Sequence, residues 1–164
     1  MDYMGQIDFV KFFKAYHRHD VFVEVPQKNW LAKELNGTPE VLCNGRFIDI
    51  LTSEHLIECK APSDSPFMLI RTAVEQLMVY EGHYSSRKRV VVYFHRWHFT
   101  PVLPWCTKEM LDMVKAEFWI VCGNNDSDSE FTAMNEIRWG KENWFHRPRL
   151  LKMRQTLEAI RSKI

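Results

Sequence analysis

Apolar and polar positions along this 164-residue chain follow two periodicities, one typical of strands and one typical of helices. Side chains alternate faces along a strand, whereas residues three and four apart share a face of a helix. Segments with these periodicities follow one another as a helix over 7–19, strands over 20–26, 46–51 and 56–60, a helix over 66–81, a strand over 89–95, a helix over 107–117, a strand over 118–122 and a helix after Pro148. This order predicts an α/β fold in which a mixed sheet is flanked by helices.

Capping and turn residues support several of these boundaries. Ser65-Pro66 is a favourable helix start, because serine caps well and proline is tolerated in the first turn. Gly82 is placed to end that helix, and Thr107 is expected to cap the next one. Pro26 is expected to end the strand over 20–26. The strand over 89–95 is the most apolar of the set, which predicts a central position in the sheet.

A polar loop, Thr52-Ser53-Glu54-His55, joins the strands over 46–51 and 56–60 and suits a hairpin turn. If the loop pairs Leu51 with Leu56, the strands are antiparallel and their register is fixed. Two acidic residues, each two positions farther from the loop, then lie directly opposite each other. Side chains in that relation have Cβ atoms about 4.5–5.5 Å apart, and like charges there are destabilising. The hairpin therefore needs a compensating positive charge.

Asp49 and Glu58 are the two opposed acidic residues, and Lys60 shares a strand face with Glu58. Lys60 could offset part of the repulsion, but Mg²⁺ or Mn²⁺ would offset it better, because hard cations take carboxylate oxygens and keep water ligands for reaction. A lysine beside the metal could position an attacking water or stabilise a pentavalent phosphorus. The alternative interpretation is a surface hairpin with an ordinary cross-strand salt bridge. The apolar Arg46–Ile50 context favours a functional carboxylate over that alternative.

Length and composition indicate one domain over 1–164 with enough apolar residues for a core. No apolar run is long enough to cross a membrane, and the start of the chain lacks the pattern of a signal peptide. An intracellular, cytoplasmic protein is the expectation. The four cysteines are widely spaced without a C-x-x-C pair, which argues against a compact zinc or iron–sulfur site.

Net charge is only +1, yet positive charge is concentrated near the end of the chain. From residue 138 to 164 there are eight lysines and arginines against two glutamates, an excess of about six. Arg147 and Arg149 in this segment are candidate phosphate contacts, and a solvated helix face is the alternative. Trp144 and Phe145 lie among these cations; they could stack on bases, although packing beneath the last helix is the favoured interpretation.

The motifs of this chain, in their order and spacing, resemble those of the PD-(D/E)XK nuclease superfamily and of its RecB-like branch. The matching residues are Glu24-Val25-Pro26, Gly45-Arg46-Phe47-Ile48-Asp49, Ile57-Glu58-Cys59-Lys60 and Gln76 to Tyr80. The resemblance implies a restriction-endonuclease-like αβββαβ core over about 7–95, followed by a helical C-terminal extension over about 100–164. Ile48 stands where the proline that names the superfamily is expected.

The resemblance also implies roles for individual residues. Asp49 and Glu58 would bind Mg²⁺ or Mn²⁺ with the backbone carbonyl of Cys59, and Lys60 would be catalytic. Gln76 and Tyr80 would form the Q-x-x-x-Y motif, which supports the site and contacts nucleic acid.

The first helix of that branch often supplies a further metal ligand. His17 is the candidate here, and a histidine at a helix end without a ligand role is the alternative. Asp8 and Glu24 are less suitable acids for the same role.

The expected function is metal-dependent hydrolysis of DNA phosphodiesters, with RNA left open as a substrate. A homodimer is one expected assembly, since cutting both strands of a duplex often requires two active sites. The alternative is a nucleic-acid-binding or assembly module that keeps the fold without cutting.

Overall fold

A computed structural model describes residues 24–60, 66–95, 102–123, 131–134, 138–141 and 144–164. The expected helix over 7–19, with His17 and Asp8, lies outside these residues, as does the expected cap Ser65. The described elements are α2 (Glu24–Glu34), β1 (Thr38–Cys43), β2 (Arg46–Leu51), β3 (His55–Lys60), α3 (Pro66–Val79), β4 (Lys88–His95), β5 (Val102–Leu103), α4 (Trp105–Met113), β6 (Ala116–Gly123), β7 (Phe131–Met134), β8 (Arg138–Trp139), the 3₁₀ turn η2 (Trp144–His146) and α5 (Arg147–Arg161).

Six of the strands form one mixed sheet in the order β1-β2-β3-β4-β6-β7. The pairs β3–β4 and β4–β6 are parallel, while β1–β2, β2–β3 and β6–β7 are antiparallel. The short strands β5 and β8 pair separately. The predicted α/β class with a mixed sheet is confirmed, and β4 has the central position that its apolar sequence predicts.

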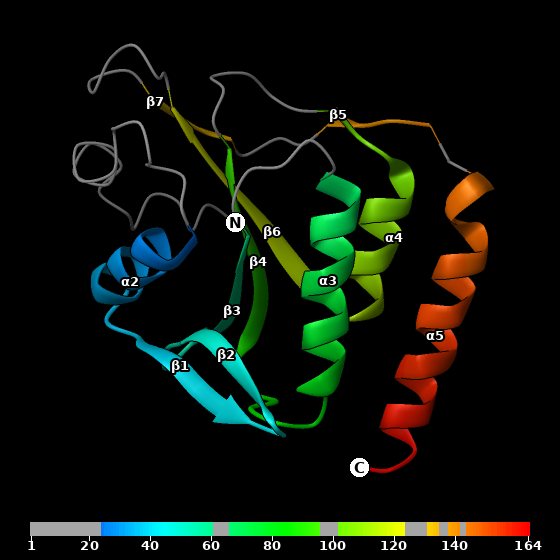
Figure 1. Ribbon diagram of the computed structural model, residues 1–164, viewed down its shortest axis with the longest axis horizontal. Coiled ribbons are helices and arrows are strands. Elements are labelled where there is room, and N and C mark those ends of the chain that lie inside the picture. Colours follow the sequence, from blue (N-terminus) through cyan, green and yellow to red (C-terminus); the bar gives the residue numbers. More distant parts are fainter. Residues whose placement is uncertain (1–23, 61–65, 96–101, 124–130, 135–137, 142–143) are drawn as a thin grey trace.

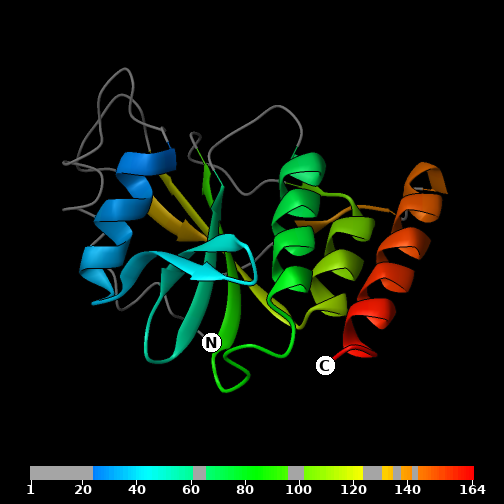
Figure 2. The same ribbon diagram turned by 60° about the horizontal axis from the view of Figure 1, so that its bottom comes forward.

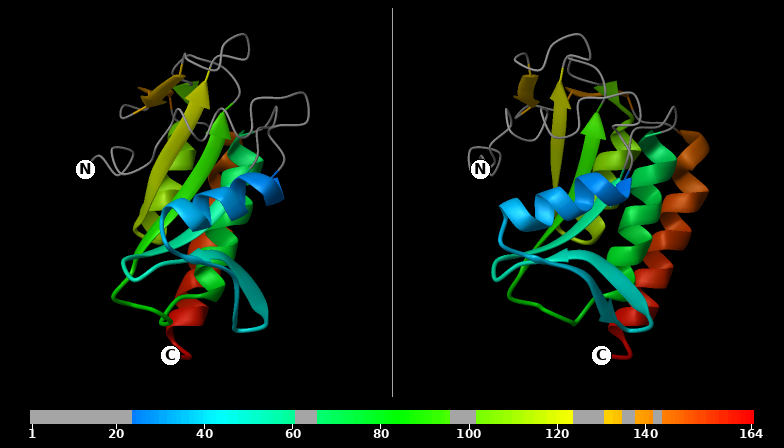
Figure 3. Two further views of the ribbon diagram at one scale, coloured as in Figure 1. Left: turned by 90° about the vertical axis from the view of Figure 1, so that its left-hand side faces the viewer. Right: turned by 60° about the vertical axis from the view of Figure 1, so that its left-hand side comes forward.

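Helices cover both faces of the sheet (Figures 1 and 2). The three helices α3, α4 and α5 lie on one side, and α2 crosses the strands β1, β2 and β3 on the other side (Figure 3). Within the first part of the chain the elements follow the order α2-β1-β2-β3-α3-β4. The residues after 100 add β6 and β7 to the same sheet and α4 and α5 to the same layer of helices.

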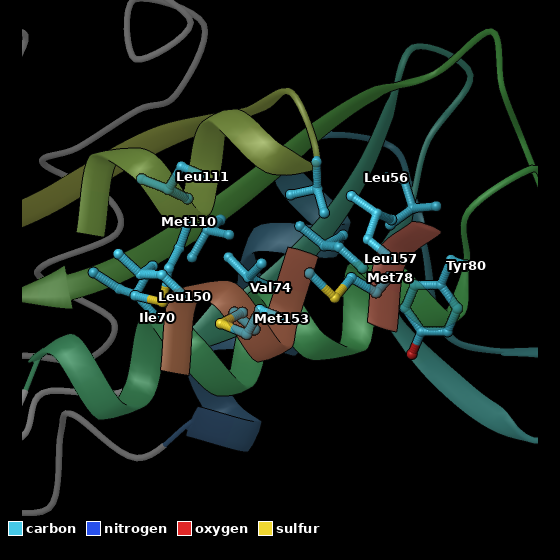
Figure 4. Close-up of a cluster of buried hydrophobic side chains, with 14 of the residues drawn as sticks. Leu56, Ile70, Val74, Met78, Tyr80, Met110, Leu111, Leu150, Met153 and Leu157 are labelled. Atoms are coloured by element: carbon cyan, nitrogen blue, oxygen red, sulfur yellow. The ribbon is translucent and has the colours of Figure 1, made fainter. Parts of the chain in front are cut away.

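A hydrophobic core lies between the sheet and the helices α3, α4 and α5 (Figure 4). Val74 and Leu77 of α3 and Met110 of α4 are fully buried there, and Met153 of α5 is 5% exposed. Leu56 of β3 joins the same cluster from the sheet. None of the helices in the described ranges combines the length and apolar character needed to cross a bilayer.

The strand expected over 20–26 is wrong at residues 24–26, where α2 begins at Glu24, while residues 20–23 lie outside the described residues. Pro26 was interpreted as the end of a strand, but proline lacks only an N–H that the first turn of a helix leaves unpaired anyway. The residues that follow, Gln27 to Glu34, include strong helix formers such as leucine, alanine, lysine and glutamate. From Glu24 onward a helix thus takes the place of the expected strand.

Strand β1 was not predicted, although the sequence holds a clear signal for it. Asn44-Gly45 has φ values of 50° and 80°, the left-handed conformation that both central residues of a type I′ hairpin turn require. This turn joins β1 to β2 and pairs Cys43 with Arg46. The Asn44 side-chain amide also donates to the Val79 carbonyl at 3.0 Å, which ties the hairpin to the end of α3.

Two other boundaries differ from the prediction. Helix α4 starts at Trp105, with Pro104 at the cap position, so Thr107 lies inside the helix and does not cap it. Helix α3 ends at Val79, slightly before the expected Glu81, and Gly82 follows with a φ of 86°. The pairing of Leu51 with Leu56 is confirmed.

Candidate functional site

Three carboxylates lie in one line across the antiparallel part of the sheet. The β1–β2 pairs Pro39–Ile50 and Val41–Ile48 place Glu40 opposite Asp49. Continuing the β2–β3 register from Ile50–Ile57 places Asp49 opposite Glu58. Neither acidic pair belongs to the ladders themselves, and Glu40 has a positive φ of 55°. The regular pairing of the strands is therefore interrupted where the acidic residues meet.

The Asp49 carboxylate lies where the pairing of β2 with β3 is interrupted. Its Oδ2 accepts a hydrogen bond from the Cys59 backbone N–H at 2.8 Å, so the side chain takes the place of a ladder partner. Its Oδ1 lies 3.6 Å from the ammonium of Lys28. The residue is only 8% exposed. A carboxylate this buried is stabilised by a neighbouring cation and a backbone donor.

Lys28 is a site residue that the sequence reasoning missed. It extends from α2, is 5% exposed, and forms ion pairs with both Glu40 and Asp49. The strand predicted over 20–26 places Lys28 in the connection that follows it, and a lysine in a connecting loop needs no buried partner. Once α2 is recognised as a helix across the sheet, a lysine on its inner face requires an acidic partner.

Glu58 is the most unusual residue of the site. Its side chain is fully buried, and within the described part of the chain no donor reaches either of its carboxylate oxygens. Burial, followed by the charge of Asp49, raises the pKa of Glu58 to about 9, against an opposing effect of Lys60. Removing a carboxyl group from water and placing it beside a second carboxylate both favour its neutral form. The pair therefore holds a proton at neutral pH or needs a cation in its place.

Lys60 ends β3 and is 8% exposed. It lies two residues from Glu58 on the same strand, and its positive charge lowers the pKa of that carboxyl. The structure thus groups Asp49, Glu58 and Lys60, as the sequence predicted, and adds Lys28 on the α2 side. Lys28 also pairs with Glu40, so two lysines face three carboxylates and the centre keeps one net negative charge if all three carboxylates are ionised.

Tyr80 and Gln76, one turn apart near the end of α3, have different surroundings. The Tyr80 hydroxyl donates to the Phe47 carbonyl at 2.8 Å, at the edge of the core cluster (Figure 4). Burial, then the charges of Glu58 and Asp49, raise the pKa of Tyr80, which places its hydroxyl near the acidic pair. Gln76 instead lines a hollow between α3 and α5, and its Oε1 has no hydrogen-bond partner among the described residues. Tyr80 belongs to the site, whereas Gln76 lines that hollow.

A Tyr80→Phe variant tests whether this hydroxyl holds β2 in place. Phe47 is half exposed, so losing the bond removes only its net contribution, and we expect the free energy of unfolding to fall by about 1 kcal/mol. Urea denaturation of the metal-free protein measures the loss. Tyr84→Phe is a matched control, because Tyr84 is only partly buried and lies in the loop after α3. A Tyr80→Phe protein as stable as wild type would contradict this role.

Arg147 and Arg149 differ in their contacts. Arg147 pairs with Glu109 of α4 at 2.8 Å and lies over the Trp144 ring, 5.5 Å from its centroid. Arg149 is exposed and donates to the sulfur of Met68 at 3.4 Å, a weak acceptor, and it forms no ion pair with a described residue. Arg149 is thus the better placed of the two for a phosphate. The contacts of Arg147 indicate a structural ion pair between α4 and α5.

The donor set at the hairpin fits a hard divalent cation in part. The fully buried Glu58 oxygens lack donors, and Asp49 lies beside them. Carboxylate and backbone carbonyl oxygens are the ligands that Mg²⁺ and Mn²⁺ accept. Across the residues that the structure describes, however, no three histidine, cysteine, aspartate or glutamate side chains gather into a potential metal-binding group. A cation would therefore rest on two carboxylates, the Cys59 carbonyl and water.

Comparison of the chain with models of protein families, with curated proteins and with solved structures finds no match. The resemblance to PD-(D/E)XK nucleases therefore stays a prediction that rests on the motifs themselves.

Proposed function

We propose that this chain is a divalent-metal-dependent nuclease that hydrolyses DNA phosphodiester bonds. The observation that carries the proposal is Glu58, a fully buried carboxylate without hydrogen-bond donors among the described residues, beside Asp49 and Lys60. A buried carboxyl group has a large energetic cost unless it is protonated or bound to a cation. A site that gathers such a group with a second carboxylate and a lysine suits phosphoryl chemistry.

Each residue has a separate role in the proposed reaction. Asp49 and Glu58 would hold Mg²⁺ or Mn²⁺ together with the Cys59 carbonyl. When bound, such a cation supplies a water of lowered pKa and neutralises negative charge on the phosphate. Lys60 would orient the attacking water and stabilise the additional charge on the phosphoryl oxygens. The water oxygen bonds to phosphorus as the bond to the leaving oxygen breaks, and the water proton passes to solvent while the leaving oxygen gains one.

The order α2-β1-β2-β3-α3-β4 supports the same proposal, because it is the αβββαβ order that the resemblance to PD-(D/E)XK nucleases implies. In that arrangement the acidic residues come from the second and third strands and the supporting tyrosine from the helix that follows. Here Asp49 lies in β2, Glu58 in β3 and Tyr80 directly after α3. His17 would add a ligand from the first part of the chain.

Substituting Asp49→Asn and Lys60→Met separately tests the proposal. Both replacements preserve side-chain volume while removing a charge, and each is expected to lower the rate of Mg²⁺- or Mn²⁺-dependent DNA cleavage by at least about 100-fold. Gel assays with linear, circular, single-stranded and branched DNA measure the rate. Lys33→Met, an exposed lysine of α2, is the control. Metal-dependent cleavage that survives both substitutions would refute the assignment of these residues.

A catalytically inactive nucleic-acid-binding or assembly module is the second candidate. The observation that favours it is the ion pair between Lys28 and Asp49, which neutralises one carboxylate without a metal. Protonated Glu58 would neutralise the other. Calorimetric titration with Mn²⁺ separates the candidates: the nuclease binds Mn²⁺ through Glu58, and the inactive module does not.

A further inference from the structure

Helices α3 and α5 lie side by side along the face of the molecule away from α2 (Figures 1 and 3). Contacts join them near both ends. Arg149 of α5 meets Met68 of α3 at 3.4 Å, and Arg161 of α5 pairs with Glu81, just after α3, at 3.2 Å. Between these contacts the helices enclose a hollow of about 460 Å³.

This hollow, which we call the α3–α5 groove, is strongly basic. Arg46, Arg71, Arg149 and Lys152 line it, against one carboxylate, Glu75, which leaves three net positive charges. Glu75 pairs with Arg71 at 3.3 Å. Arg46, Arg149 and Lys152 are exposed, and none of them forms an ion pair with a described residue. Uncompensated cations along a groove are the electrostatic feature of a polyanion site.

Two exposed aromatic residues lie just before α5. Trp144 is 73% exposed and Phe145 is 90% exposed, although the sequence favoured packing beneath the last helix. Their neighbour His146 does pack, stacked on Phe67 at the start of α3 with 3.7 Å between ring centroids. That contact holds the aromatic pair next to the Arg149 end of the groove.

We propose that the α3–α5 groove binds single-stranded nucleic acid, with its phosphates along Arg149, Lys152 and Arg46 and an unpaired base on Trp144 or Phe145. A basic groove beside exposed rings is the combination that binds single strands without sequence preference. From Arg149 to Ile160 the groove follows eleven residues of helix, about 17 Å, which matches about five stacked nucleotides. A duplex keeps its bases paired and stacked inside, where these rings cannot reach them.

This inference deepens the proposed function, since it names the class of substrate. Arg46 begins β2, three residues before Asp49, so about 10 Å of strand separates the groove from the acidic pair. A strand held in the groove therefore passes close to the site that we propose cuts it.

Fluorescence anisotropy with a labelled oligo(dT) of about 15 nucleotides, measured in EDTA, tests the groove separately from cleavage. Reversing two charges, Arg149→Glu with Lys152→Glu, is expected to weaken binding by at least about ten-fold. The slope of the logarithm of the binding constant against the logarithm of salt concentration should also fall in magnitude by about 1.4. Replacing both rings, Trp144→Ala with Phe145→Ala, should weaken binding about ten-fold at unchanged salt slope. The matched control reverses two exposed lysines elsewhere, Lys33→Glu with Lys163→Glu.

A duplex of the same length is expected to bind more weakly than oligo(dT). Binding of single strands in the α3–α5 groove is refuted if the two-lysine control and the Arg149→Glu, Lys152→Glu variant lose affinity for oligo(dT) equally. It is also refuted if the duplex binds more tightly than oligo(dT). It is also refuted if loss of the two rings dissociates a dimer in sedimentation and leaves oligo(dT) binding unchanged. Tight oligo(dT) binding without metal-dependent cleavage would instead contradict the proposed nuclease activity and support binding of single strands in the α3–α5 groove.

Discussion

Glu58→Gln is expected to stabilise the metal-free protein at neutral and alkaline pH. Because the folded state raises the pKa of Glu58 from 4.5 to about 9, its neutral form is the one that the fold favours. That contribution is fully present below pH 4.5 and is lost as the pH rises toward 9. Each pH unit in this window removes up to about 1.4 kcal/mol from the free energy of unfolding. Glutamine is neutral throughout and removes this pH dependence.

Thermal unfolding from pH 5 to pH 9 in EDTA measures the effect. The wild type should lose on the order of a few kcal/mol between pH 5 and pH 8, while Glu58→Gln changes little. Under the proposed function, Mn²⁺ at pH 8 should raise the Tm of the wild type only, because the cation replaces the proton at Glu58.

Glu54→Gln is the control, an exposed glutamate in the same hairpin. If Glu58→Gln lowers the Tm at every pH, the carboxyl is held charged in the fold and our description of the site is wrong. A glutamine variant that Mn²⁺ still stabilises as much as wild type would instead argue against Glu58 as a metal ligand.

Lys28→Met is expected to change stability and metal affinity in opposite directions. Asp49 is 8% exposed and loses its nearest cation, so we expect the metal-free protein to lose about 2–4 kcal/mol of stability. The Cys59 N–H still donates to Asp49, which limits the loss. Without a competing ammonium at the same carboxylate, Mn²⁺ should bind about ten-fold more tightly.

Denaturant unfolding in EDTA and calorimetric titration with Mn²⁺ measure the two effects. Lys33→Met is the matched control, since it removes a lysine from the same helix at an exposed position. Weaker Mn²⁺ binding by Lys28→Met would contradict the competition between Lys28 and the metal. Unchanged stability would show that the Asp49 carboxylate does not need this ion pair.

The hairpin that carries Asp49 and Glu58 could be predicted because its signals are local. A strand alternates its side chains with a period of two, so pairing Leu51 with Leu56 sets the register of every other residue in β2 and β3. The same reasoning could have found β1 from Asn44-Gly45, whose left-handed turn is characteristic of a hairpin. Recognising β1 would have placed Glu40 in line with the other two acids.

The environment of the site could not be predicted in the same way. Lys28 lies 21 residues before Asp49, and Tyr80 lies 33 residues after Phe47, so their contacts depend on how α2 and α3 pack against the sheet. The exposure of Trp144 and Phe145 depends likewise on the packing of the residues before α5, where His146 stacks on Phe67 and the two preceding rings stay exposed. Local periodicity contains no information about such distant partners.

The sequence by itself determined the class of fold, the β2–β3 register and the identity of the two carboxylates and the lysine at the hairpin, because these follow from side-chain alternation over a few residues. Only the tertiary structure decided how that site is electrically balanced. Burial gives Glu58 its raised pKa, and the crossing of α2 brings Lys28 to Asp49. Both effects arise from removing charges from water, which happens only when distant elements close over the sheet.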